Sequence, residues 1–63
     1  MTVNGKAVDY EPLTLLEYLR RNGYRVEYVV VERACEIITR ERFGEIILQE
    51  SDNLNILQFM GGG

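Results

Sequence analysis

Residues 14–23 read TLLEYLRRNG and carry the start, body and end signals of one short helix. Thr14 and Glu17 have the spacing of a capping box, in which each side chain accepts a hydrogen bond from the other residue's backbone N–H. Two arginines stand in the last turn, where positive charge suits the helix dipole, and Gly23 suits the position just after a helix. We therefore predict a helix over about residues 14–22 with one apolar face. The side chains of that face are Leu15, Leu16 and Leu19, with Tyr18 or Leu13 at its edge.

Extended segments lie on both sides of the predicted helix. Before it, Val3 and Val8 flank Asn4-Gly5, which predicts a β-hairpin because both central residues tolerate positive φ. After it, apolar runs typical of short extended segments occupy residues 29–31, 37–38, 46–48 and 54–59. One helix can cover only one face of the sheet that such strands form. The expected fold is an α+β domain of residues 1–60, with a mixed four- to five-stranded sheet and one main helix packed across one face.

Polar segments connect the predicted strands. The turn between residues 33 and 36 contains Ala34-Cys35, and neither residue favours positive φ, which argues against a primed two-residue hairpin there. Residues 39–44 predict a turn or one helical turn, and residues 49–53 predict a polar loop. The acidic side chains of this region could help to dock a basic partner, although solvated surface charge is the simpler interpretation. They are Glu41, Glu45, Glu50 and Asp52.

Apolar residues alternate along the last predicted strand. Leu54 and Ile56 point to one side of the sheet, whereas Leu57 and Phe59 point to the other. If the first pair faces the helix, the second pair lies on the uncovered sheet face. It would then form an apolar docking surface, unless other side chains cover it.

Three glycines, Gly61, Gly62 and Gly63, follow the last apolar run. A tail without side chains can enter a narrow channel, and its end presents the main-chain carboxylate of Gly63. Glycine runs also serve as linkers. The tail alone is therefore open to two interpretations, as a reacting group or as a flexible linker over residues 61–63.

Composition excludes several classes of function. The 63 residues carry ten acidic and seven basic side chains, and a net charge of −3 argues against nucleic acid as a partner. The sequence lacks histidine, the commonest metal ligand and general base, and its single Cys35 cannot form an internal disulfide. No apolar run approaches the ~20 residues of a membrane span, and no signal-peptide pattern is present. We expect a cytoplasmic protein that contacts no membrane and binds no metal or cofactor.

The motifs together resemble the ThiS family, the sulfur carrier proteins of thiamine biosynthesis with a ubiquitin-like β-grasp fold. The resemblance covers nearly the whole chain. Its motifs are Val3-Asn4-Gly5-Lys6, Thr14-Leu15-Leu16, Val29-Val30-Val31-Glu32-Arg33, Glu36-Ile37-Ile38, Arg40-Glu41-Arg42-Phe43, Asp52 and Phe59-Met60-Gly61-Gly62-Gly63. It implies that the first and last strands are parallel neighbours in the sheet.

The resemblance also implies a chemistry for the tail. A free α-carboxylate has a pKa of about 3.5, so it is an anion at pH 7 and must be activated before it can accept sulfur. In the family, a ThiF-like adenylyltransferase uses ATP to adenylate the terminal glycine, here Gly63. A cysteine desulfurase or rhodanese-like donor supplies the sulfur, and the resulting thiocarboxylate delivers it to a ThiG-like thiazole synthase. The chain would be a protein cosubstrate and not an enzyme, because it contains no P-loop and no nucleophile–histidine pair.

These implications define candidate site residues. Gly63 is the reacting residue, Gly61 and Gly62 thread the tail into the partner, and Leu57, Phe59 and Met60 bind the partner. Cys35 has no feature that would clearly activate its thiol, so we interpret it as a bystander.

Other functions share parts of this pattern. One alternative is a sulfur carrier like the small subunit of molybdopterin synthase, which has the same fold and tail. Another is a ubiquitin-like modifier conjugated through Gly63, and a third is an interaction module with an incidental tail.

Overall fold

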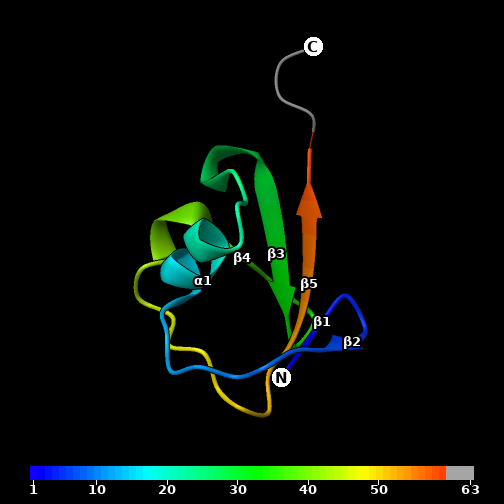
Figure 1. The fold of residues 1–63 in the computed structure, drawn as a ribbon. Helices are drawn as coiled ribbons and strands as arrows, with labels where there is room; N and C mark the ends of the chain where they lie inside the picture. Colours follow the sequence, from blue (N-terminus) through cyan, green and yellow to red (C-terminus); the bar gives the residue numbers. More distant parts are fainter. Residues whose placement is uncertain (60–63) are drawn as a thin grey trace.

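Five strands form one mixed sheet in the order β2-β1-β5-β3-β4, and one helix crosses one face of it (Figure 1). The computed structural model describes residues 1–59. The strands are β1 (Thr2–Val3), β2 (Lys6–Ala7), β3 (Val29–Arg33), β4 (Glu36–Ile38) and β5 (Asn53–Gln58), the helix is α1 (Leu15–Arg21), and two 3-10 turns are η1 (Val26–Tyr28) and η2 (Arg40–Arg42). The predicted α+β arrangement is therefore confirmed.

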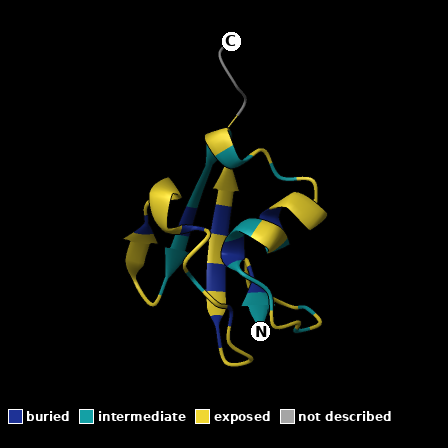
Figure 2. Ribbon diagram, turned by 90° about the vertical axis from the view of Figure 1, so that its left-hand side faces the viewer, coloured by how far each residue is buried: buried dark blue, intermediate teal, exposed yellow. Residues whose placement is uncertain are grey.

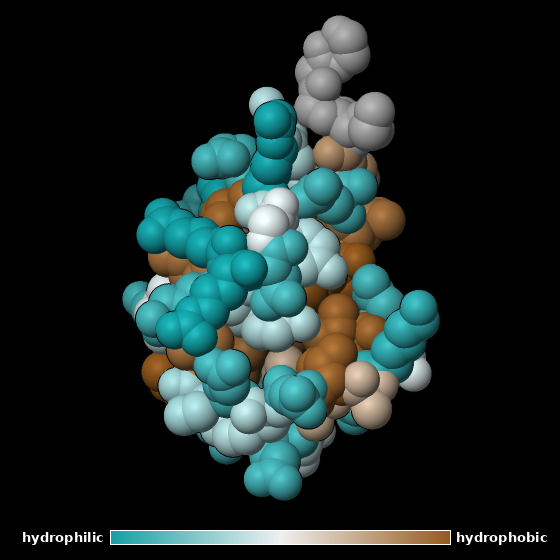
Figure 3. Space-filling model, in the orientation of Figure 1, coloured by the Kyte–Doolittle hydropathy of each residue, from teal (hydrophilic) through white to brown (hydrophobic). Residues whose placement is uncertain are grey.

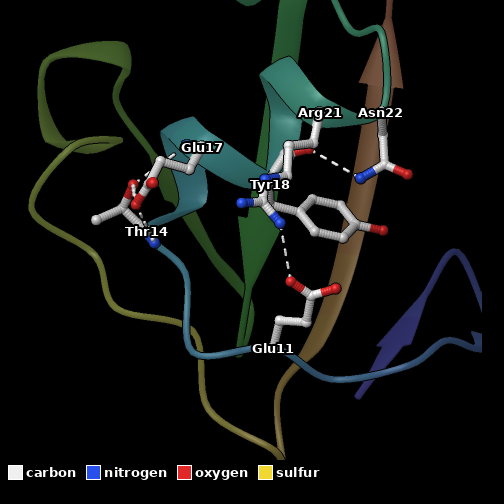
Figure 4. A network of polar contacts seen from close by, with 6 residues as sticks. All are labelled: Glu11, Thr14, Glu17, Tyr18, Arg21 and Asn22. Atoms are coloured by element: carbon white, nitrogen blue, oxygen red, sulfur yellow. Dashed lines mark hydrogen bonds and ion pairs between the residues drawn. The ribbon is translucent and has the colours of Figure 1, made fainter.

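The helix begins and ends where the sequence predicts. The Thr14 hydroxyl accepts from the Glu17 backbone N–H at 3.1 Å, and the Glu17 carboxylate accepts from the Thr14 N–H at 3.3 Å (Figure 4). After α1, Gly23 adopts a φ of +78°, the left-handed conformation that ends helices. The capping box fixes the start of α1, because it satisfies two N–H groups that have no partner within the helix.

The core lies between α1 and the inner face of the sheet. Two leucines of α1, Leu15 and Leu19, are fully buried, whereas Leu16 and Tyr18 lie half-buried at the edge. Burial and the neighbouring Tyr24 raise the pKa of Tyr18. The other buried hydrophobic residues are Val3, Val31, Ile38, Phe43, Leu48, Leu54 and Ile56.

The first hairpin and the parallel pairing of the first and last strands are both as predicted. Asn4 and Gly5 form the β1–β2 turn with φ values of 53° and 82°. Strand β5 then lies parallel to β1, with Thr2 opposite Asn53. Residues 46–48, expected to be extended, belong to no strand of the sheet, and Ile47 forms an isolated antiparallel bridge with Thr14.

The turn between β3 and β4 differs from the sequence-based expectation. Ala34 and Cys35 have φ values of 52° and 65°, so they form the primed two-residue hairpin that their residue types disfavour. The register explains this outcome, because Arg33 pairs with Glu36 and Val31 with Ile38, which buries both apolar side chains of the second pair. A two-residue turn whose twist matches the strands preserves this register. Strand pairing and burial thus override the local preference.

Asp52 also differs from its interpretation as a solvated surface charge. It is buried, and its carboxylate accepts from Arg33 Nε at 3.0 Å and from the Gln49 N–H at 2.7 Å. Its carbonyl accepts from the Thr2 N–H at 2.9 Å. Asp52 therefore joins the loop before β5 to both β3 and β1.

The strained turn predicts a stabilising substitution. A non-glycine residue in the left-handed region costs roughly 1–2 kcal/mol, and Asn and Gly relieve most of this cost. The double variant Ala34→Asn, Cys35→Gly reproduces the first hairpin's turn and should raise the free energy of unfolding by about 1 kcal/mol. Chemical denaturation checks this. Gly5→Ala is the matched control. It should be destabilising because of the positive φ of Gly5 alone, since an added methyl group would meet no neighbouring atom there. A double variant less stable than the native chain would contradict the interpretation.

Candidate functional site: the open sheet face and the end of β5

The sheet face opposite α1 carries exposed apolar side chains. Along β5 the buried and exposed residues alternate, as Figure 2 shows. Leu57 is 60% exposed and Phe59, just after the strand, is 51% exposed. Ile37 of β4 is 69% exposed, and Val30 of β3 lies directly opposite Leu57. We call Val30, Ile37, Leu57 and Phe59 the open-face patch.

A shallow groove crosses the middle of this face. Its lining includes the open-face residues Val30, Ile37 and Leu57, together with Asn4. A polar contact lies among these apolar groups, because Asn55 Nδ2 donates to the Glu32 carboxylate at 2.9 Å. A partner surface that is mostly apolar, with a polar group near Glu32, would complement this groove.

The C-terminal end of β5 is held from the β3 side. The Phe59 N–H donates to the Tyr28 carbonyl at 2.7 Å, and the Gln58 side chain accepts from the Arg25 N–H at 2.9 Å. Both contacts join β5 to η1 or to the residue before it. Figure 3 shows apolar surface over this end of β5. The last described residue, Phe59, is therefore held in place within the open-face patch.

Asn4 holds β5 from the other side. Its side-chain oxygen accepts from the Ile56 N–H at 2.8 Å, and its Nδ2 donates to the Ile56 carbonyl at 3.1 Å. Strand β1 ends at Val3, and the Asn4 side-chain amide makes the two hydrogen bonds to β5 that a further backbone peptide of β1 would otherwise make. We call this pair of hydrogen bonds the Asn4 clamp.

Among the predicted site residues, the structure places two and leaves four outside its description. Leu57 and Phe59 lie on the open face, as expected if Leu54 and Ile56 face the helix. Met60 and the three glycines lie outside the described residues, so their roles stay predictions. Cys35 is exposed in the β3–β4 turn. Arg33 lies opposite Leu54, so the turn that holds Cys35 is at the end of the sheet where β5 begins, opposite from Phe59.

Sequence reasoning missed three contributors to this site. Val30 and Ile37 belong to the open-face patch through the register of β3 and β4, which the apolar runs do not specify. The Asn4 clamp was also missed, because Asn4 was interpreted only as a turn residue. Over residues 1–59, no group of three or more His, Cys, Asp or Glu side chains is arranged to hold a metal ion. In that same range no helix is long and apolar enough to cross a membrane.

Comparison with known proteins gives a consistent family match. The ThiS family model matches residues 1–63. The sulfur carrier protein ThiS of Bacillus subtilis is 35% identical, and the alignment covers all of this chain and 98% of that protein. The crystal structure of a thiamine biosynthesis protein (ThiS) from Geobacter metallireducens superposes with a TM-score of 0.76 at 41% identity, over 98% of this chain and 96% of that one.

A longer relative is also similar. A thiazole synthase of Magnetococcus marinus is 37% identical over 62 residues. This chain spans only 19% of the length of that protein, although 97% of the chain is aligned.

The Asn4 clamp predicts a graded response to substitution. Asn4→Gly keeps the turn but deletes both hydrogen bonds to Ile56, and it should lower the free energy of unfolding by about 1–3 kcal/mol. Asn4→Asp retains the acceptor and, when ionised, lacks the donor. Protonation restores a donor, so the stability deficit of Asn4→Asp should be small at low pH. The deficit should grow as pH rises through the carboxyl pKa, about 4 for an unperturbed group. Denaturant titrations of both variants against the native chain from pH 3 to 7 check this. A pH-independent deficit for Asn4→Asp would contradict the clamp.

Proposed function

The chain belongs to the ThiS family of sulfur carrier proteins of thiamine biosynthesis, and we propose that it carries sulfur on the terminal carboxylate of Gly63. The observation that carries this proposal is the family match over residues 1–63, which includes the glycine tail. The β-grasp domain supports it by holding β5, which precedes that tail, in a fixed position. The relatives are ThiS proteins and a thiazole synthase, so they favour the thiamine pathway over molybdopterin synthesis.

The proposed chemistry begins with activation. The Gly63 carboxylate attacks the α-phosphate of ATP on a ThiF-like adenylyltransferase, which gives an acyl-adenylate and releases pyrophosphate. The terminal sulfur of a persulfide, supplied by a cysteine desulfurase or a rhodanese-like protein, then attacks the carbonyl carbon and displaces AMP. A second thiol cleaves the resulting acyl disulfide, which leaves a thiocarboxylate on Gly63 and a disulfide on the donor side. The second thiol supplies the two electrons of this reduction.

In this scheme the described domain contributes binding energy and not catalytic groups. Contacts far from a reacting atom can be used to position it in the partner's active site. The open-face patch is suited to such contacts, because it is apolar, exposed and continuous with the end of β5. Gly61 and Gly62 would give the tail the slimness to reach that active site.

Thiazole synthase is the proposed acceptor of the sulfur. In the relative from Magnetococcus marinus, the segment similar to this chain is part of a thiazole synthase. Carrier and synthase segments in one polypeptide support an association between the separate proteins as well. The carrier would then dock on the synthase with its tail directed into the active site.

The assignment of Gly63 predicts a mass change that depends on the tail. Coexpression with the adenylyltransferase and a sulfur donor should yield a chain in which one oxygen is replaced by sulfur, detected by intact mass spectrometry. Deleting Gly63, or adding one residue after it, should abolish this change and ATP–pyrophosphate exchange while the domain stays folded. Gly62→Val should impair both by adding bulk and restricting φ. Cys35→Ser is the control and should convert normally. Normal exchange after deletion of Gly63 would refute the assignment.

Because Phe59 is an exposed aromatic residue of the open-face patch, we expect its side chain to be an anchor of the interface with both partner proteins. Truncation of a true interface anchor costs about 2 kcal/mol or more, or roughly thirtyfold in affinity. Phe59→Ala should therefore weaken binding to the adenylyltransferase and to thiazole synthase, both measured by calorimetry. Its unfolding free energy should change little, because Phe59 is half exposed. Ile47→Ala is the matched control, because Ile47 is 52% exposed but pairs with Thr14 at the start of α1. Equal affinities of the two variants would rule out Phe59 as an anchor.

A further inference from the structure

The two edges of β5 are paired to different extents. On the β3 side, pairing continues from Leu54 to Gln58. On the β1 side, the register aligns only Asn53 and Leu54 with residues of β1. The Leu54 carbonyl accepts from the Asn4 N–H, and the Asn4 clamp then holds Ile56. Figure 1 shows the consequence, because the β1–β2 hairpin borders only the first part of β5, and the later part of the strand has a neighbour only on the β3 side.

The direction of the backbone groups on β5 follows from its hydrogen bonds. Antiparallel neighbours exchange hydrogen bonds at every second residue. Because the Phe59 N–H donates to Tyr28 on the β3 side, Leu57 also directs its N–H and carbonyl toward β3. Ile56 must direct its own groups the other way, and its two hydrogen bonds to Asn4 confirm this.

Gln58 follows the same alternation as Ile56. Its N–H and carbonyl therefore point toward the β1 side, beyond the end of the Asn4 clamp. Within residues 1–59, neither group forms a hydrogen bond on that side. The Gln58 side chain does not cover this edge, because it accepts from the Arg25 N–H. The result is a short free edge on the strand that leads into the tail.

Apolar side chains flank this edge on the open face. Leu57 and Phe59, on either side of Gln58, are both more than half exposed. An added strand satisfies the backbone groups of an edge and places every second side chain on one face. A strand with apolar residues at alternate positions would therefore pair with Gln58 and extend the open-face patch.

We propose that an extended segment of thiazole synthase adds to the free edge of β5 at Gln58, continuing the line of β1. This inference rests on the proposed function, which supplies thiazole synthase as the partner. The added strand would hold β5 on both sides up to the last described residue. The direction in which the tail leaves the domain would then be fixed by backbone hydrogen bonds, in addition to contacts with side chains.

Two substitutions at Gln58 distinguish the contribution of its backbone N–H to binding from that of its side chain. Proline is tolerated in edge strands where the missing N–H would face solvent, so Gln58→Pro should remove the proposed donor and keep the fold. Gln58→Ala is the matched control, because it also loses the contact with Arg25 but keeps the N–H. Affinity for purified thiazole synthase should be about tenfold lower for Gln58→Pro than for Gln58→Ala, with similar unfolding midpoints. Equal affinities would overturn the inference.

Amide hydrogen exchange of the native chain tests the same edge without substitution. In the free protein the Gln58 amide should exchange fast, whereas the Phe59 amide should be protected by Tyr28. Addition of purified thiazole synthase should slow the Gln58 amide at least tenfold. A Gln58 amide that exchanges equally fast in the complex would overturn the inference, even if Gln58→Pro fails to fold.

These experiments distinguish failure of the proposed strand addition from failure of the proposed function. If Gly63 acquires sulfur but the Gln58 amide stays unprotected in the complex, the proposed function stands and the strand addition does not. If no sulfur appears on Gly63, the proposed function itself fails.

Discussion

The pairing of β5 with both β3 and β1 is the constraint on which the rest of the structure depends. β5 is the central strand, and its inward side chains Leu54 and Ile56 lie in the core with α1. Asp52, just before the strand, bonds groups of both neighbouring strands. The same strand precedes the glycine tail on which we propose that sulfur is carried. Whatever fixes the position and register of β5 therefore also fixes the position of Phe59, the last described residue.

Much of the fold follows from local sequence signals. The capping box at Thr14, the turn at Asn4-Gly5 and the alternation along β5 each act within a few residues, and the structure shows all three. The Ala34-Cys35 turn could not be predicted in this way, because burial of the β3–β4 pairs decides it against local preference. Asp52 was misjudged for a similar reason, because its partner Arg33 is distant in sequence.

The candidate site likewise contains residues that local sequence signals predict and residues that only long-range pairing places there. The exposure of Leu57 and Phe59 follows from strand alternation once the helix is assigned to one face. Val30 and Ile37 join them only through the registers of β3 with β5 and β4, which sequence alone leaves open. The second role of Asn4 depends on a contact 52 residues away. Side chains that act across such distances give no local pattern to recognise.

The pairing of Thr2 with Asn53 has a consequence for how the polypeptide folds during its synthesis on the ribosome. Ribosomes make the central strand of this sheet after all its other strands, so a nascent chain that lacks β5 has β1 and β3 without the neighbour that joins them. Contacts of such long sequence separation slow folding, and unpaired strand edges promote aggregation in the meantime. A polypeptide broken off before residue 53 would therefore lack both the sheet's centre and the segment that we propose as the carrier of sulfur. Activating enzymes that recognise the assembled open face would then engage only chains whose synthesis had passed β5.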